Sequence, residues 1–324
     1  MRTRQWLLNA LTAAILVGLG ACGGGGGDDT PAGPTIDIST VNRDTVAHAT
    51  VAGVFGLTLG TTTPLASGSS GSARSMAAWL QTQSARLASA ATQREHPMAV
   101  FGPTEAPCGV SGSMTVTWDD ADNDRVIGSA GDVLTGVFTN CVDPELADAT
   151  VNGTMVARVL SDTDMRMEMT QLSFDTSRHS MTVNGTVRLT MVSVDTAQTK
   201  TEGAVTVNVA LNHLAPPFTD TVTLQSGFVA QETITNGGEF IRTVNGLLES
   251  AAAGGVVRLT TPSNTPIRQF ETYDYPYTGV LQIKGMNSAL QMTVLSADQV
   301  RLDLDADNNG TFESTSTVPW DWLL

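Results

Sequence analysis

Positive charge is scarce in this chain of 324 residues, which has 17 lysines and arginines against 32 aspartates and glutamates and a net charge of −15. Only two of these cations are lysines, Lys200 and Lys284. Nucleic-acid binding requires a basic face that neutralises phosphates, so this composition excludes a general nucleic-acid binder. No apolar run of about 20 residues follows the N-terminal region, which excludes a helical membrane protein.

The residue types that carry catalysis are few and show no catalytic spacing. The four histidines, His48, His96, His179 and His213, do not stand at metal-ligand spacing. Ser111 lies in Gly-Val-Ser-Gly-Ser, which lacks the final glycine of a nucleophile elbow. The many carboxylates could supply an acid pair for glycoside hydrolysis, but nothing in the sequence marks one. We therefore expect a protein that is not an enzyme.

The first thirty residues carry an export signal. Arg2 and Arg4 form a positive region, and residues 6–19 form an apolar stretch that is too short to span a bilayer. The stretch ends in Leu19-Gly20-Ala21-Cys22, which resembles the lipobox of bacterial lipoproteins. The resemblance implies cleavage before Cys22 and acylation of that cysteine, so the expected partner is a membrane, through the lipid anchor. An ordinary signal peptide with a chance cysteine is the alternative.

The lipobox also predicts how the N-terminal region is organised. Residues 1–21 are expected to be a lipoprotein signal peptide, and residues 22–36 a flexible tether rich in glycine. Without Arg2 and Arg4 the mature chain has a net charge of −17. In lipoproteins generally, aspartate directly after the acylated cysteine favours the inner membrane. Here that position is Gly23, so the resemblance implies the bacterial outer membrane, with the protein facing the periplasm or the surface.

Two further cysteines, Cys108 and Cys141, remain in a chain that is expected to be exported. In an oxidising compartment the simplest state of such a pair is a disulfide. A redox or metal-binding role would need closer spacing, such as Cys-x-x-Cys, which is absent. We therefore predict a Cys108–Cys141 disulfide.

The hydrophobic pattern changes from helical to extended along the chain. Residues 37–55 fit a helix with a cap at Ser39, and residues 73–94 fit an amphipathic helix. From Val110 onward apolar and polar residues alternate, with many valines and threonines, which is typical of antiparallel strands. We expect residues 37–100 to form a helical and loop segment and residues 101–324 to form a β domain.

The predicted fold is mainly β. We expect an antiparallel meander that forms either a sandwich or a strongly curved open sheet, with one or two N-terminal helices on part of its apolar face. Three Val-Asn-Gly sequences recur, starting at Val151, Val183 and Val244. Asn-Gly pairs favour tight turns between strands, so these repeats predict hairpins.

The strongest candidate for a binding site is an oxygen-rich loop near the C-terminus. Its candidate metal ligands are Asp305, Asp307, Asn309, Thr311 and Glu313. Alternate residues of a tight loop can direct their oxygens inward, and Gly310 permits the sharp turn. Calcium prefers six to eight oxygen ligands, and the spacing is similar to that of short calcium loops in surface proteins. A solvated hairpin turn is the alternative.

A second acidic loop lies between the two cysteines. Its candidate metal ligands are Asp120, Asp122, Asp124 and Asp132. The first three have the alternating spacing of a calcium loop, but Arg125 replaces the glycine and brings a positive charge. Asp132 stands one place later than the last ligand position of such a loop. A solvated acidic loop is the alternative, and calcium in either loop would be structural.

Two stripes of side chains complete the candidates. Tyr273, Tyr275 and Tyr277 would share one face of an extended segment and could stack on the rings of a sugar ligand. Pro276 between them favours a sheet edge with a structural role instead. Methionines at 165, 167 and 169 alternate in the same way, which fits flexible core packing on one strand face.

The layout as a whole resembles a group of uncharacterised proteobacterial lipoproteins. The resemblance rests on the lipobox, on the stretch between Cys108 and Cys141 with its acidic loop, and on the Asp305–Gly310 loop with a closing Trp320. It implies a periplasmic or surface β domain and no known activity. We expect an outer-membrane-anchored lipoprotein with a non-enzymatic structural or binding role. The alternative is a carrier of a lipid or another hydrophobic ligand.

Overall fold

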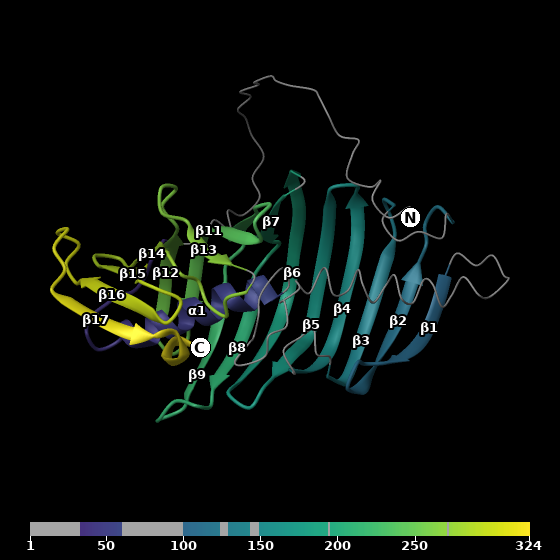
Figure 1. Cartoon of the computed structure of the whole chain (residues 1–324), viewed down its shortest axis with the longest axis horizontal. Helices are drawn as coiled ribbons and strands as arrows, with labels where there is room; N and C mark the ends of the chain where they lie inside the picture. Colours follow the sequence, from purple (N-terminus) through teal and green to yellow (C-terminus); the bar gives the residue numbers. More distant parts are fainter. Residues whose placement is uncertain (1–32, 60–99, 124–128, 143–148, 194, 271) are drawn as a thin grey trace, which may run out of the picture. The chain divides into compact units, whose positions relative to one another are not determined.

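The computed structural model describes residues 33–59, 100–123, 129–142, 149–193, 195–270 and 272–324. In this part of the chain, 17 strands form one antiparallel hydrogen-bonded sheet (Figure 1). This confirms the predicted mainly β fold and its antiparallel meander. Helix α1 (Arg43–Leu59) is one of the two predicted N-terminal helices. The other, over residues 73–94, lies outside the described residues.

The first six strands lie side by side, and each pairs with the next along the chain (Figure 1). They are β1 (Val100–Pro107), β2 (Ser111–Asp119), β3 (Val133–Val142), β4 (Thr150–Ser161), β5 (Asp164–Asp175) and β6 (His179–Ser193). Buried and exposed residues alternate along them, as the sequence pattern predicts. In β5, for example, Met167 and Met169 are buried whereas Arg166 and Glu168 are exposed.

The Val-Asn-Gly repeats do not form the predicted hairpin turns; they lie inside strands, and two of them lie opposite β-bulges of neighbouring strands. Asn152 Oδ1 accepts a hydrogen bond from the backbone N–H of Asn140 at 2.7 Å, and Asn184 Oδ1 accepts one from Gln171, also at 2.7 Å. Both donors are non-glycine residues with positive φ, 47° at Asn140 and 49° at Gln171. The pairing register shifts at these points. The asparagine side chain therefore satisfies the backbone group that the bulge removes from the ladder.

Glycine is required beside each bulge because the neighbouring backbone approaches too closely for a side chain. A Cβ atom on Gly153 would lie 2.1 Å from the carbonyl oxygen of Gln171, and one on Gly112 would lie 1.9 Å from that of Asn140. Both glycines also have positive φ, 106° and 77°. The bulges thus lie on the alternate strands β3 and β5, and each shifts the pairing register with both of its neighbours at corresponding places.

The sheet divides along β6. Its first half, His179–Asn184, pairs with β8, and its second half, Val187–Ser193, pairs with β7. β8 continues to β9 and β7 continues to β10, and both branches meet again at β11. These strands are β7 (Thr196–Thr201), β8 (Val205–Leu211), β9 (Phe218–Leu224), β10 (Val229–Ile234) and β11 (Glu239–Ser250).

The last strands extend the sheet from β11 to the C-terminus. β12 and β13 both pair with β11, β12 also pairs with β14, and β14 to β17 pair in sequence order. They are β12 (Gly255–Thr260), β13 (Ile267–Phe270), β14 (Gly279–Lys284), β15 (Ala289–Val294), β16 (Gln299–Asp305) and β17 (Ser314–Pro319). A single helical turn, α3 (Trp320–Leu323), follows.

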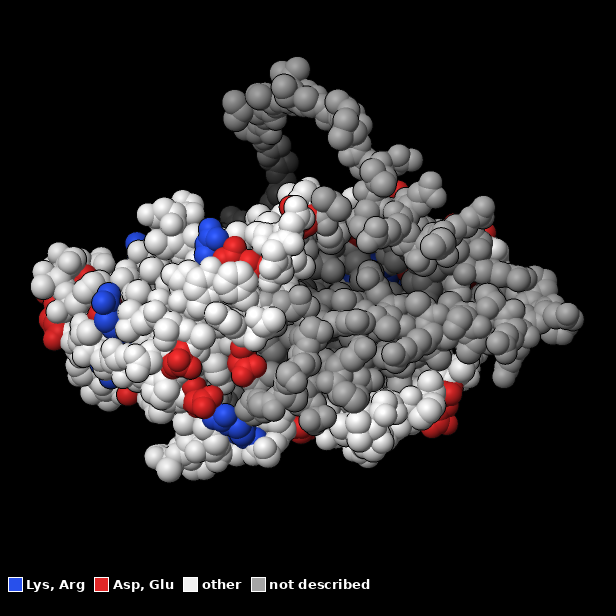
Figure 2. Space-filling model, viewed as in Figure 1, with Lys and Arg blue, Asp and Glu red and all other residues white. Residues whose placement is uncertain are grey.

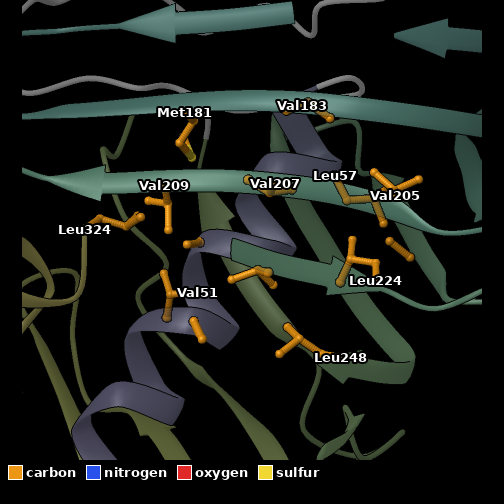
Figure 3. Close-up of a cluster of buried hydrophobic side chains, with 14 of the residues drawn as sticks. Val51, Leu57, Met181, Val183, Val205, Val207, Val209, Leu224, Leu248 and Leu324 are labelled. Carbon is orange, nitrogen blue, oxygen red and sulfur yellow. The ribbon is translucent and has the colours of Figure 1, made fainter. Parts of the chain in front are cut away.

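Helix α1 packs on the apolar side chains of β8, β9 and β11. Figure 3 shows Val51 and Leu57 of the helix among Val207 of β8, Leu224 of β9 and Leu248 of β11. Every residue from 46 to 53 is buried, so the helix has no solvent-facing stripe over this stretch. It begins at Arg43 rather than just after Ser39, because Asn42 Oδ1 accepts the backbone N–H of Ser39 and closes a turn there.

The predicted disulfide is present. Cys108 and Cys141 are bonded, with their Cα atoms 5.5 Å apart, and Cys141 is fully buried. In the chain-entropy account, a loop of this length contributes roughly 4 kcal/mol to the free energy of unfolding. Neither helix of the described part is long and apolar enough to cross a membrane.

Close packing of α1 makes Gly53 a sensitive position. A Cβ atom there would lie 2.8 Å from both Leu248 Cδ1 and Val222 Cγ1. We predict that Gly53→Val lowers the free energy of unfolding by about 1–3 kcal/mol, measured by urea denaturation, because the core is overpacked. The matched control is Gly237→Val in a surface turn, where a Cβ atom would have its nearest neighbour at 3.8 Å. An equal loss in both variants would contradict this account of the helix.

Candidate functional site

The C-terminal acidic loop connects β16 to β17 and brings three carboxylates together. Ligand atoms of Asp305, Asp307 and Glu313 lie within 4.8 Å of one another, so this cluster could hold a metal ion. Asp305 ends β16 and is 4% exposed, whereas the other two side chains are exposed. The strand therefore fixes one ligand, and the loop brings the other two back towards it.

Backbone groups of the same loop bind the carboxylates. Asp305 accepts the N–H of Asn309 on Oδ1 at 3.0 Å and that of Gly310 on Oδ2 at 2.8 Å. Glu313 Oε2 accepts the N–H of Ala306 at 2.6 Å. The other predicted ligands belong to the same hydrogen-bonded turn, since the N–H of Thr311 donates to Asn309 Oδ1 at 2.8 Å. These bonds hold the oxygens in place.

The second acidic loop joins β2 to β3 and forms a similar cluster. Ligand atoms of Asp120, Asp122 and Asp132 lie within 4.8 Å of one another, and this cluster could also hold a metal ion. Asp120 is 1% exposed and Asp132 is fully buried. Asp132 accepts the backbone N–H groups of Ala121 and Ser129, both at 3.0 Å, so it closes the loop despite its late place in the sequence. The fourth predicted ligand, residue 124, lies outside the described residues.

The three tyrosines do not share one face, because residues 272–277 do not form a strand. Tyr273 and Tyr277 pack on Phe270, and the rings of Tyr277 and Phe270 are stacked with centroids 5.1 Å apart. Tyr275 lies apart from them and stacks on Trp320 with centroids 5.7 Å apart. Tyr273 keeps 42% of its surface exposed. Any ring ligand would therefore meet Tyr273, and not a stripe of three rings.

Three of the four histidines meet around the C-terminal turn, which the sequence pattern did not indicate. His213 contacts the carbonyl oxygens of Asp321, through Nε2 at 2.7 Å, and of Arg178, through Nδ1 at 3.2 Å. His48 of α1 lies against Trp322, with ring centroids 4.3 Å apart. The cluster ties the last residues of the chain to α1, to the turn before β6 and to the loop after β8.

Burial sets the protonation of two of these histidines. Desolvation, followed by electrostatic interaction with His213 and Arg178, lowers the pKa of His179 to about 4. Desolvation also lowers the pKa of His48. His179 Nε2 is buried and has no hydrogen-bond partner among the described residues. Both rings are therefore neutral near neutral pH and pack against their neighbours. Packing alone accounts for these two histidines.

Most arginines of the described part are paired with acidic side chains. Figure 2 shows small groups of charged side chains, with acidic and basic ones side by side in places, on an otherwise uncharged part of the described surface. Seven arginines of the described part form ion pairs, among them Arg242 with Glu232 at 2.6 Å and Arg188 with Asp164 at 2.7 Å. Arg188 and Thr190 hold the pKa of Asp164 below its usual value through hydrogen bonds.

Comparison with protein-family models, with curated protein sequences and with solved structures found no match. No related protein therefore indicates a site, and the choice rests on geometry. By that criterion the two acidic clusters are the best-defined candidate sites of the described part. Their oxygen-only composition suits a hard divalent cation and offers no thiolate or imidazole for a transition metal.

Protonation of His179 should make the protein less stable in mild acid. The unfolded chain, with an ordinary histidine pKa, binds the proton more tightly than the folded protein, so a falling pH favours unfolding. We predict a loss of roughly 2 kcal/mol in the free energy of unfolding between about pH 7 and pH 5 from this residue alone. His179→Leu should remove this part of the pH dependence, measured by urea denaturation at both pH values. An unchanged pH dependence in the variant would exclude His179 as the cause.

Proposed function

We propose that this protein is an outer-membrane-anchored lipoprotein with a non-enzymatic structural or binding role, stabilised by calcium in its two acidic loops. The observation that carries the calcium proposal is the pairing, in each loop, of buried and exposed carboxylates within 4.8 Å. The lipid anchor is supported by the lipobox that ends at Cys22 and by the disulfide, which fits an oxidising compartment.

Electrostatics favours a cation in both loops. Three carboxylates so close together repel one another, and burial of Asp120, Asp132 and Asp305 weakens the screening by water. A divalent cation removes this repulsion, and the net charge of −17 of the mature chain raises its local concentration. Calcium fits better than magnesium, because it accepts irregular oxygen sets whereas magnesium demands near-octahedral geometry.

The packing of α1 supports a structural or binding role over a carrier of hydrophobic ligands. A carrier needs an apolar cavity that its ligand can enter. On β8, β9 and β11 the apolar side chains are instead covered by α1, with Val207, Leu224 and Leu248 each fully buried. Helix α1 thus occupies the place where a hydrophobic ligand would have to bind, and the apolar side chains there belong to the hydrophobic core.

Calcium should raise the melting temperature. A cation that binds only the folded state adds about 2.7 kcal/mol to the free energy of unfolding at 100 times its dissociation constant. We predict a higher Tm in calcium than in chelator, and a smaller rise in magnesium. Asp307→Asn with Glu313→Gln should remove part of the difference, because both side chains are exposed ligand candidates of one loop.

The matched control for charge is Asp298→Asn with Glu105→Gln, two exposed acids outside both clusters. This control should keep the full calcium effect. If the wild-type Tm is the same in calcium and in chelator, the acidic loops are solvated turns and the calcium proposal fails.

The lipid anchor has a separate test. Cys22→Ser should abolish acylation and move the protein from the membrane fraction to the soluble fraction, measured by fractionation and by the mass of the N-terminal peptide. Cys141→Ser is the control, since it removes a different thiol and should leave the protein acylated. A Cys22→Ser protein that remains with the membrane would contradict the anchor.

A further inference from the structure

We infer that the strand ends around the β14–β15 turn, where residues 33–38 join the sheet, lie against the lipid bilayer. We call this region the end of the sheet. This inference rests on the proposed lipid anchor and adds the surface that meets the membrane. The contact surface comprises Val41, Met286 and Phe312, together with Arg258 and Lys284. The lipids of the bilayer that holds the acyl chains are its partner.

The folded part of the chain is fixed to this end of the sheet from its first residues. The N–H of Thr35 donates to the carbonyl oxygen of Val256 in β12 at 3.0 Å. The N–H of Met286, in the turn between β14 and β15, donates to the carbonyl oxygen of Ile36 at 2.8 Å. The N–H of Ile38 also bonds to Ser288 of that turn. Residue 33 therefore leaves the fold beside the β14–β15 turn.

The stretch of chain between Cys22 and Gly33 is too short to separate this end of the sheet from the bilayer by much. Ten residues lie between Cys22 and Gly33. A glycine-rich chain of this length has an end-to-end distance on the order of 20 Å, and about 40 Å when fully stretched. The surface around the β14–β15 turn is thus the part of the fold that stays nearest to the acyl chains.

Three apolar side chains are exposed at this end of the sheet. Met286 is 58% exposed in the turn itself, and Val41, shortly after the joined residues, is 92% exposed. Phe312 is 45% exposed in the loop between β16 and β17. The pairing places that loop at the same end, since Ala289 of β15 lies opposite both Lys284 and Asp305. Apolar side chains at the tip of a fold gain free energy by entering the interfacial region of a bilayer.

Two basic residues near this end of the sheet add positive charge, which an anionic membrane surface attracts. Arg258 and Lys284 lie directly opposite each other on β12 and β14, and both are exposed. Neither forms an ion pair within the described part of the chain, unlike seven of the other arginines. Like charges opposite one another destabilise a strand pair, whereas both are attracted to an anionic membrane surface.

The test places a fluorescent label at either end of one strand. Cys22 is acylated under the proposal and Cys108 is bonded to Cys141, so an introduced cysteine is the only free thiol. Met286→Cys lies at one end of β15 and Leu295→Cys, 45% exposed in the wild type, at the other. Each acylated, labelled protein is reconstituted into vesicles of phosphatidylethanolamine and phosphatidylglycerol that contain spin-labelled phosphatidylcholine. Equal Tm values verify that both variants fold.

We expect the spin label to quench the fluorophore at position 286 and to leave the one at 295 unquenched. Arg258→Gln with Lys284→Gln should weaken the quenching at 286 in these vesicles more than in vesicles of phosphatidylcholine alone. Vesicle-bound protein with equal quenching at both positions, or with quenching at 295 only, overturns this inference and leaves the lipid anchor intact. Protein that does not sediment with the vesicles overturns the anchor and this inference together.

Discussion

The bulges on β3 and β5 are the feature on which the first half of the sheet depends. Each joins a positive-φ residue on one strand to an asparagine oxygen on the next, as from Asn140 to Asn152. If a positive-φ residue of either bulge were extended instead, the close backbone approach that Gly112 and Gly153 allow would be lost. The disulfide reinforces the first bulge, because Cys141 follows Asn140 and the N–H of Cys108 donates to the carbonyl oxygen of Gly112. Covalent and hydrogen-bonded constraints thus coincide where the sheet begins.

The second half of the fold is organised by the division at β6 and by α1. A strand of 15 residues pairs with two shorter strands in succession, and the branches rejoin at β11. Helix α1 packs where β8, β9 and β11 meet, and its small residues, including Gly53, let it approach them closely. The helix in turn carries His48 to the C-terminal turn, where Trp322 covers it. The last residues of the chain are therefore held by a helix near its beginning.

Period-two alternation was sufficient to predict the strands, and the two spare cysteines were sufficient to predict their bond. The sequence could not distinguish a hairpin at Asn152 from a bulge opposite it, because an Asn-Gly pair serves both and the choice depends on the neighbouring strand. It did identify Asp132 as a candidate ligand although this residue stands one place late for a standard calcium loop, and the structure brings Asp132 into the acidic cluster. The histidine cluster depends on contacts between segments far apart in sequence, such as His48 with Leu323, and no local pattern indicates those.

The hydrogen bonds inside the acidic loops determine what a bound cation can contribute. Both oxygens of Asp305 and both of Asp132 already accept backbone N–H groups, so each loop is formed by its own bonds. A bound cation would then act by removing repulsion among carboxylates rather than by creating the loop, in contrast to zinc sites whose domains unfold without metal. The disulfide and the core hold the sheet independently of either loop. If the proposed calcium binds, it should therefore add stability to a fold that the core and the disulfide already hold, and the two loops, on different hairpins, should add their effects separately.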